Sequence, residues 1–315
     1  MLISFIIPHK GRLELLKATV QSIFNQDIEL SLIEIIIVSQ NSELPIETVS
    51  AKHTDKITII LRPESDTISA LRNTGAHISQ GKFLAFLDAD VDLKPNWSAT
   101  MLTELESDQS RAMLSAAQTY LDDAPPIEKI RTTLSSSALD QAVSFMPGCN
   151  LFIKRETFNQ AGGFPEHLVT CEDYFFSHQV SKLGQLYYTS KTSFIHLGED
   201  KNLKEMFHKE KWRGQSNLQS IKGRSVPLRE VPSFLIPFWL LFFFIMSIIS
   251  IIMYEPIISF ISLFLLLLPI GMYSLRLYKL ANNTIHFVDI LKFYLVYFPA
   301  RIIGTLKGLT KLLKA

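Results

Sequence analysis

Two long apolar segments near the carboxyl end of the chain place the strongest limits on its fold. Ser233–Tyr254 and Pro256–Leu275 contain no charged residue. Each is close to the ~20 apolar residues that a helix needs to cross the hydrocarbon core of a bilayer. Only Glu255 lies between them, which leaves room for a tight turn. We therefore expect a transmembrane helical hairpin at residues 233–275.

Basic residues flank this hairpin and are absent from its turn, so the positive-inside rule places both flanks in the cytoplasm. They are Lys201, Lys204, Lys209, Lys211, Arg213, Lys222, Arg224 and Arg229 before it and Arg276, Lys279, Lys307, Lys311 and Lys314 after it. The apolar run at the N-terminus is too short for a signal peptide. We expect a multi-pass protein of the cytoplasmic (inner) membrane with its N-terminal domain in the cytoplasm.

The segment 284–313 is amphipathic, because Asp289, Lys292 and Arg301 lie among aromatic and aliphatic residues. Such a pattern favours a helix that lies in the membrane interface. A third membrane span and a helix docked on the soluble domain remain open alternatives.

Residues 1–220 have the pattern of an α/β domain. Short apolar runs at 2–7, 33–38, 56–61 and 82–87 alternate with segments of helical spacing at 13–24 and 67–79. Strands that alternate with helices form right-handed βαβ units around a parallel sheet. We expect further strands at 111–118, 150–154 and 185–195, helices at 155–161, 171–183 and 202–221, and a loop at 121–139.

Asp88-Ala89-Asp90 follows the apolar strand 83–87 and is the strongest chemical signal. Alternation along an extended chain directs both carboxylates to one side. Two such oxygen ligands suit Mn²⁺ or Mg²⁺, and the alternative is a solvated turn. Asp92 is a weaker candidate, which could instead cap a helix near Pro95.

Four other groups are candidates for binding or catalysis. Glu172-Asp173 could supply a general base, although acidic residues also favour a helix start that Thr170 would cap. His196, at the end of a strand, could be a third metal ligand or a structural histidine. Arg72 and Asn73 lie on the helix before the carboxylate strand, where a surface role is the alternative. Lys211-Trp212-Arg213 could face a diphosphate or lipid headgroups.

The order of these motifs resembles glycosyltransferase family 2, the inverting enzymes with the Rossmann-like GT-A fold. The resemblance covers about residues 1–215 and includes Leu71-Arg72-Asn73-Thr74-Gly75, Phe86-Leu87-Asp88-Ala89-Asp90, Pro147-Gly148-Cys149-Asn150 and Glu172-Asp173. It implies a mixed, mostly parallel sheet that binds a nucleotide-sugar donor.

The resemblance also implies roles for individual residues. Asp88 and Asp90 match the family's metal- and diphosphate-binding motif, with His196 as a further metal ligand and Ala89 beside the donor. Asp173 matches the catalytic base, with Glu172 as its neighbour. The implied donor-binding residues are Pro8, Lys10, Arg12, Gln40, Asn41, Arg72 and Asn73.

The chain departs from the family pattern at two strand ends. The first loop reads Pro8-His9-Lys10-Gly11, where the family usually has Pro-x-Tyr-Asn. The second strand ends in Ser39-Gln40-Asn41-Ser42, where the family usually has a pair of acids. Because an amide can both donate and accept, binding of a base or ribose is still expected, but the identity of the base is left open.

These observations predict an inverting transferase that moves a sugar from a nucleotide diphosphate to a lipid-linked or glycan acceptor in polysaccharide synthesis. Residues 121–147 are a candidate lid or acceptor-recognition element. The balanced charge, formally +1, argues against a nucleic-acid partner and leaves membrane lipid as a partner. A metal-dependent nucleotidyltransferase and a non-catalytic, glycan-binding membrane protein remain the alternatives.

Overall fold

The computed structural model describes residues 1–215, 228 and 231–312. The chain forms two compact units. The first contains residues 1–121 and 138–199, and the second contains residues 122–137 and 200–315.

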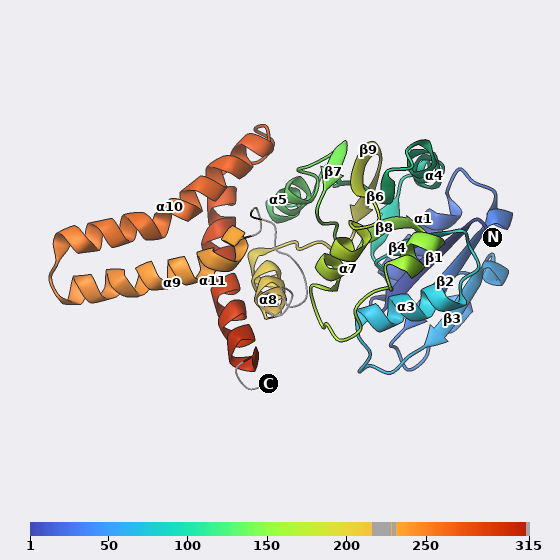
Figure 1. The fold of residues 1–315 in the computed structure, drawn as a ribbon, viewed down its shortest axis with the longest axis horizontal. Coiled ribbons are helices and arrows are strands. Elements are labelled where there is room, and N and C mark those ends of the chain that lie inside the picture. The colour runs from blue at the N-terminus through green and yellow to red at the C-terminus, as the bar shows by residue number, and fades with distance from the viewer. Residues whose placement is uncertain (216–227, 229–230, 313–315) are drawn as a thin grey trace. The chain divides into compact units, whose positions relative to one another are not determined.

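A mixed sheet forms the centre of the first unit (Figure 1). Its order is β3-β2-β1-β4-β8-β6-β9-β5, and β7 pairs with β9. The strands β1 to β4 run parallel to one another, as predicted, and β8 is the first antiparallel neighbour. The bounds are β1 Ile3–His9, β2 Ile33–Ser39, β3 Ile57–Leu61, β4 Phe83–Leu87, β5 Val91–Leu93, β6 Arg111–Thr119, β7 Gln141–Val143, β8 Asn150–Lys154 and β9 Gln185–His196.

Helices cover both faces of this sheet, because the strands are apolar on both sides. Phe5 and Ile7 of β1 face a core that includes Val20 of α1 (Leu13–Phe24) and Met101 of α4 (Trp97–Ser107). Ile6 faces the other side of the sheet, where it belongs to a second core formed with three further helices. Those helices are α3 (Ile68–Ile78), α6 (Arg155–Gln160) and α7 (Glu172–Val180), and short turns of helix occur at α2 (Ile46–Val49), η1 (Leu30–Leu32) and η2 (Thr54–Lys56).

The described part of the second unit is helical. It contains α5 (Pro126–Ser135), α8 (Leu203–Gly214), α9 (Val231–Ile252), α10 (Pro256–Leu280) and α11 (Phe287–Leu312). α8 and α11 cross closely at glycines: a Cβ on Gly304 would lie 2.5 Å from the carbonyl oxygen of Lys211. A helix in the amphipathic segment is therefore confirmed, and its place at the membrane interface stays a prediction.

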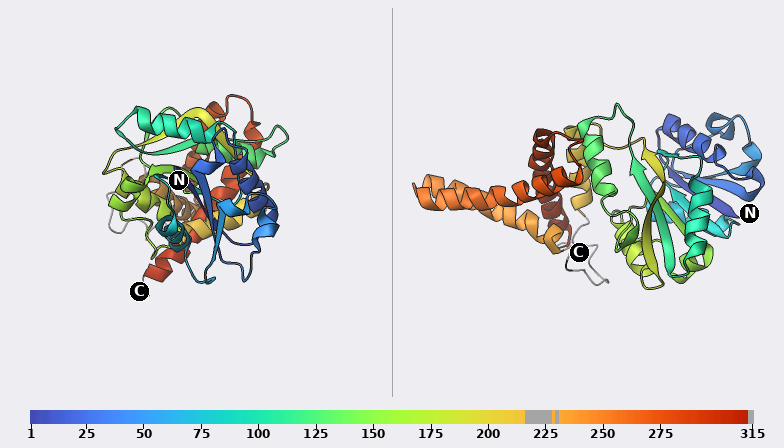
Figure 2. Two further views of the ribbon diagram at one scale, coloured as in Figure 1. Left: turned by 90° about the vertical axis from the view of Figure 1, so that its right-hand side faces the viewer. Right: turned by 90° about the horizontal axis from the view of Figure 1, so that it is seen from above.

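α9 and α10 form the expected hairpin, and Figures 1 and 2 show the two long helices side by side. Both are long and apolar enough to cross a membrane, and most of their large side chains are exposed. Serine hydroxyls join them, with Ser247 3.1 Å from Ser262 and Ser259 3.0 Å from Ser250. Small hydroxyl residues that bond across helices are typical of packing inside a bilayer.

Three local expectations are wrong. Residues 121–139 are not all loop, because Pro125 and Pro126 occupy the N-cap and first position of α5, where proline is tolerated. Asp92 does not cap α4, because it lies within β5 and the cap position is Asn96. The N-cap of α7 is Cys171, not Thr170. The helix expected at 202–221 is described only as far as Gly214, and residues 216–221 of that prediction lie outside the described residues.

Candidate active site

The carboxylate motif begins where β4 leaves the sheet at Leu87. Its backbone is held by neighbouring strands: the Asp88 N–H donates to the carbonyl of Cys149 at 3.1 Å, and the Leu197 N–H donates to the carbonyl of Asp90 at 2.8 Å. β5 then pairs with β9 so that Val91 lies opposite His196. This register brings His196 beside Asp90, which lies 106 positions away in the sequence.

Asp88, Asp90 and His196 form a cluster that could hold a metal ion. One ligand atom from each lies within 4.8 Å of the others. Asp90 is buried and Asp88 is half-buried, so the cluster has one open side. Two carboxylates and an imidazole are a donor set that Mn²⁺ accepts.

Glu199 holds the second ring nitrogen of His196. Its Oε2 lies 3.3 Å from His196 Nδ1 and accepts a bond from Gln118 Nε2 at 3.2 Å. Carboxylates in this position commonly orient metal-binding histidines. The sequence interpretation missed Glu199, and its only local signal is the spacing of three residues after His196.

His196 lies between two carboxylates, which favour its protonated form. Burial alone would lower the pKa of His196, but the hydrogen bonds with Asp90 and Glu199 raise it to about 10. Because a metal binds neutral imidazole, metal binding would release this proton.

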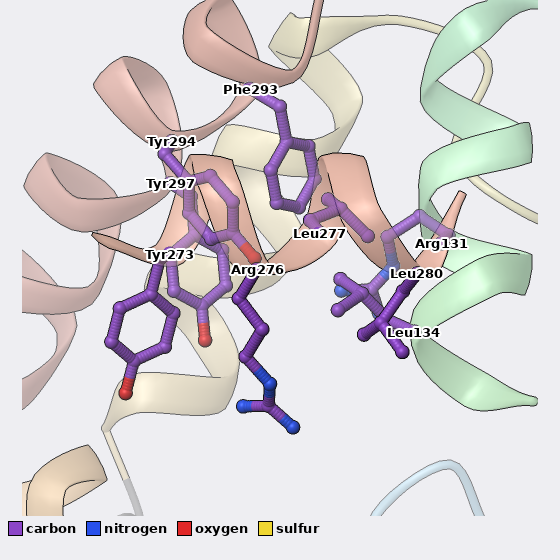
Figure 3. Close-up of a pocket in the computed structure, with 9 residues that line it drawn as sticks. All are labelled: Arg131, Leu134, Tyr273, Arg276, Leu277, Leu280, Phe293, Tyr294 and Tyr297. Carbon is purple, nitrogen blue, oxygen red and sulfur yellow. The ribbon is translucent and has the colours of Figure 1, made fainter. Parts of the chain in front are cut away.

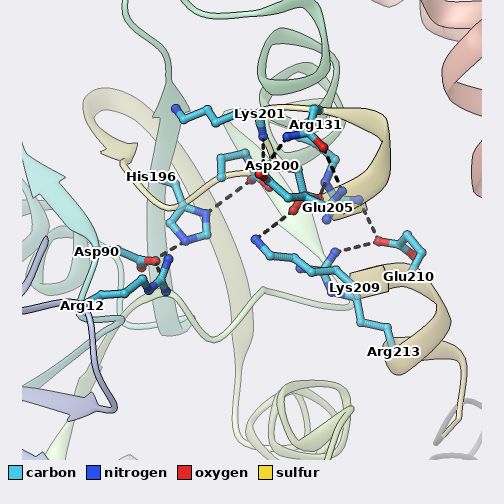
Figure 4. Close-up of polar contacts among 12 residues, drawn as sticks. Arg12, Asp90, Arg131, His196, Asp200, Lys201, Glu205, Lys209, Glu210 and Arg213 are labelled. Atoms are coloured by element: carbon cyan, nitrogen blue, oxygen red, sulfur yellow. Dashed lines mark hydrogen bonds and ion pairs between the residues drawn. The ribbon is translucent and has the colours of Figure 1, made fainter. Parts of the chain in front are cut away.

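Arg12 provides a second positive charge at Asp90, through an Nη2–Oδ2 distance of 2.7 Å (Figure 4). The backbone at Gly198 packs directly against this pair. A Cβ at Gly198 would lie 1.9 Å from Asp90 Oδ2 and 2.6 Å from Arg12 Nη1. This close approach therefore requires glycine at the position, which the sequence alone did not indicate.

Arg72 links the two acidic motifs from a fully buried position. Its Nη1 donates to Glu172 at 2.9 Å, and its Nη2 donates to Asp88 at 2.9 Å and to the carbonyl of Gly148 at 3.0 Å. Its guanidinium also lies over the ring of Phe164. The structure thus brings Asp88 and Glu172 together through one cation, although they are far apart in sequence.

Asp173 follows Glu172 at the start of α7. Its carboxylate accepts from the backbone N–H of Tyr174 at 2.9 Å and of Gly148 at 3.4 Å. Burial, and then the charge of Glu172, raise the pKa of Asp173 to about 7, while Arg72 and the two backbone bonds oppose this rise. A carboxyl group with a pKa near neutral is suited to accept a proton under physiological conditions.

The ends of β1 and β2 meet beside this cluster. Asn41 accepts a bond from the Gly11 N–H at 2.9 Å, and Gln40 donates to the carbonyl of Asp66 at 2.8 Å. Lys10 is exposed and pairs with Glu64 at 2.6 Å. Pro8 is the buried penultimate residue of β1. The predicted nucleotide-binding residues of the two loops are therefore neighbours.

The remaining predicted residues have clear positions. Asn73 accepts from the Phe164 N–H at 2.9 Å and donates to Glu166 at 2.8 Å, so it holds the segment after α6. Ala89 is partly buried between the two aspartates. In α8 of the second unit, Arg213 pairs with Glu210 at 2.6 Å and Trp212 is exposed.

Residues 4–162 match the model of Glycosyl transferase family 2. The chain belongs to this family. The matched region includes the Asp88-Ala89-Asp90 motif and Arg72 but ends before Asp173 and His196. Membership in the family favours a glycosyltransferase over a nucleotidyltransferase.

Two curated relatives are similar to part of this family 2 chain. The glycosyltransferase AglE of Haloferax volcanii is 22% identical over 189 residues, which cover 58% of this chain and 62% of that protein. The pre-mycofactocin glycosyltransferase of Mycobacterium tuberculosis is 25% identical over 152 residues, which cover 45% of this chain and 32% of that protein. The chain thus spans less than two thirds of the length of either relative.

Solved structures support the GT-A fold. The mannosyltransferase PcManGT from Pyrobaculum calidifontis, in complex with GDP-Man and Mn²⁺, has a TM-score of 0.66 at 14% identity and covers 98% of this chain and 87% of that chain. TarS of S. aureus has a TM-score of 0.52 at 14% identity, over 76% of this chain and 43% of that chain. The predicted fold class is confirmed.

Proposed function

We propose that this family 2 protein transfers a sugar, with inversion, from a nucleoside-diphosphate donor to a lipid-linked or saccharide acceptor at the cytoplasmic face of a membrane. One observation carries the proposal: Arg72 joins a metal-binding type of cluster, at Asp88, to an acidic helix start, at Glu172 and Asp173. The groups proposed to hold the donor and those proposed to accept the proton are therefore linked by the same buried arginine.

Asp90, Asp88 and His196 are the residues that would hold Mn²⁺ or Mg²⁺. When bound, such an ion neutralises the charge that develops on a leaving diphosphate. Two carboxylates and an imidazole, with ligand atoms within 4.8 Å of one another, are a donor set that such an ion accepts. The complex of PcManGT with GDP-Man and Mn²⁺ supports a nucleotide-sugar donor and manganese in this family member.

Asp173 would accept the proton of the acceptor hydroxyl, which then attacks the anomeric carbon from the side opposite the diphosphate. The C–O bond to the acceptor forms as the bond to the diphosphate breaks, so the configuration inverts. Glu172 keeps the pKa of Asp173 raised and is held by Arg72. In this proposal Arg72 is a positioning residue that orients both acidic motifs.

The nucleotide would bind across the ends of β1 and β2. Pro8, Lys10 and Arg12 lie in or beside the first loop, and Gln40 and Asn41 lie in the second, where hydrogen bonds tie the loops together. The guanidinium of Arg12 is 60% exposed and could leave Asp90 to meet a diphosphate. Asn73 would act by holding the segment of Phe164 against this region.

The membrane part of the proposal rests on α9 and α10. Their exposed apolar side chains need a lipid environment, and the basic residues before and after them favour a cytoplasmic location for the transferase domain. A catalytic domain anchored in this way would meet acceptors that are attached to lipid.

The test is a thermal-shift and hydrolysis panel of UDP-, GDP- and dTDP-sugars with Mn²⁺. Wild-type protein should be stabilised by one donor class, and Asp90→Asn should abolish this stabilisation. Asp92→Asn is the matched control, because Asp92 lies two residues further along in β5 and outside the cluster. If no nucleotide sugar stabilises the wild type, or if the two variants behave alike, the donor site is rejected. Donor binding without any transfer or hydrolysis would favour a non-catalytic protein.

A further inference from the structure

A cavity in the second unit has the lining of a site for a small anion attached to an apolar chain. Its volume is about 140 Å³, below the roughly 300 Å³ at which pockets for drug-sized ligands begin. It fits a headgroup better than a whole nucleotide sugar. The lining residues are Arg131, Leu134, Tyr273, Arg276, Leu277, Leu280, Phe293, Tyr294 and Tyr297 (Figure 3).

The polar groups in this lining are hydrogen-bond donors. Figure 3 shows the tyrosines on one side, Arg131 with Leu134 and Leu280 on the other, and Arg276 between them. Within residues 1–215, 228 and 231–312, Arg276 has no carboxylate partner and the three tyrosine hydroxyls make no hydrogen bond. The cavity therefore offers donors that an anionic oxygen could use.

The surroundings of the cavity have excess positive charge. Arg131 bonds to Glu210 at 3.0 Å, but that carboxylate also pairs with Arg213 at 2.6 Å and lies 3.5 Å from Arg301 (Figure 4). Asp200, 3.9 Å from Arg131, also pairs with Lys209 at 2.8 Å, so two carboxylates are shared by four cationic groups before Arg276 is added. A bound anion would reduce this imbalance.

The position of Arg276 on α10 places the cavity at the depth of lipid headgroups. Arg276 is the first charged residue after Glu255, and the uncharged segment Pro256–Leu275 between them is about 30 Å long as a helix. This length matches the hydrocarbon core of a bilayer. Leu277 and Leu280 supply an apolar wall beside the charged group.

From this geometry we infer that the cavity binds the phosphate headgroup of a membrane lipid. Arg276 and the tyrosine hydroxyls hold the phosphate oxygens, and the lipid chain extends along α10. The inference rests on the proposed membrane anchoring, and it specifies a phosphate-bearing lipid as the class of acceptor or activating lipid that this protein binds.

The experiment is native mass spectrometry of the full-length protein in mild detergent, titrated with phosphatidic acid or with phosphatidylcholine of the same chains. Wild type should bind phosphatidic acid at a concentration about tenfold lower than it needs for phosphatidylcholine. This difference is the effect of one charge-assisted hydrogen bond. Arg276→Ala should lose this preference, Arg276→Lys should keep most of it, and Tyr273→Phe should reduce it. Lys279→Ala is the control: Lys279 is a charged neighbour on α10 that does not line the cavity.

Equal loss in Lys279→Ala and Arg276→Ala would indicate general attraction to anionic lipid and overturn the inference, as would an unchanged preference in Arg276→Ala. Thermal melting verifies that each variant is folded, and Tyr273→Phe tests the cavity with a minimal change. If inorganic phosphate displaces phosphatidic acid at equal concentration, the site is for free phosphate and the lipid is rejected. Mn²⁺-dependent binding of a nucleotide sugar is measured on the same samples, so failure of the donor site is scored independently of lipid binding.

Discussion

The two units each contain a buried charge cluster, and the two clusters have opposite ratios of acid to base. In the first unit a single guanidinium, Arg72, serves the carboxylates Asp88 and Glu172, with Asp173 adjacent. In the second unit two carboxylates, Glu210 and Asp200, serve Arg131, Arg213, Arg301 and Lys209. The first cluster is left with negative charge and the second with positive charge. In each unit the sign in excess favours a ligand of the opposite sign: a cation beside Asp88 and, as we infer, an anion beside Arg131.

The largest expected effect is at Asp173, the proposed base. Asp173→Asn should lower the rate of transfer by about 10²- to 10⁴-fold, the usual contribution of a general base. Binding of the donor should change little, because Asp173 is not a member of the metal-binding cluster and its amide oxygen can still accept from the Tyr174 N–H. Single-turnover transfer and donor binding are measured on the same samples. Transfer at the wild-type rate would remove Asp173 from the mechanism and leave the acid-rich cluster with a binding role only.

The next effect tests the most shared group of each cluster. Arg72→Met and Glu210→Gln should each lower the free energy of unfolding by about 3–5 kcal/mol, since the first removes the partner of Asp88 and Glu172 and the second removes the partner of Arg213 and Arg301. Arg72→Lys should rescue little, because a lysine cannot provide two donors in a planar fork. Denaturant melts in detergent provide the measurement. A much smaller loss for Glu210→Gln than for Arg72→Met would show that the cationic cluster is already relaxed by solvent or lipid.

The Glu210 cluster also makes a pH prediction. Burial alone would raise the pKa of Glu210, but the three arginines lower it to about 2. A lowered pKa means that the stabilisation is fully present above the ordinary value of about 4.5 and is lost as the pH falls toward 2. In Glu210→Gln the free energy of unfolding should therefore depend less on pH between these two values than in the wild type. Denaturant melts at a series of pH values provide the measurement.

Much of this architecture could be predicted from the sequence. The strands β1, β2 and β4 are continuous apolar runs, and their polar ends mark the site because parallel strands end at one edge. The uncharged segments of the hairpin predicted two helices by length alone. Asp88 and Asp90 could be identified because the reason for their proximity is local.

The parts that could not be predicted depend on long-range packing. Arg72 was expected to bind the donor, with a surface role as the alternative, and only the fold shows that it is buried between carboxylates from two other segments. The pairing of β5 with β9 places Glu199 and Gly198 beside the Asp90 cluster, and sequence spacing does not reveal this pairing. The helix α5 was missed because two adjacent prolines suggest a loop until one of them is known to start a helix.

Glu199 offers a test of how the acid-rich cluster is tuned for a cation. Glu199→Gln should weaken Mn²⁺ binding by about 10- to 100-fold, the usual effect of removing a carboxylate that orients a histidine ligand. The matched control is Glu205→Gln, in α8 of the second unit, which should leave Mn²⁺ binding unchanged. Electron paramagnetic resonance of free Mn²⁺ reports the affinity without any need for transfer. Equal affinity in wild type and Glu199→Gln would mean that His196 is oriented by Asp90 alone.

The smallest expected effect is a shift in the pH profile of transfer. The pKa of Asp173 is raised to about 7 by burial and then by the charge of Glu172. Because the base must be a carboxylate, kcat/KM should fall by about tenfold per pH unit below 7 and be constant above it. Glu172→Gln removes the neighbouring negative charge, so the limb should move to lower pH even if the rate at its plateau is reduced. If the fall in kcat/KM stays near pH 7 in Glu172→Gln, burial alone sets the pKa of Asp173. The carboxylates around Arg72 would then contribute to cation binding and not to the pKa of the proposed base.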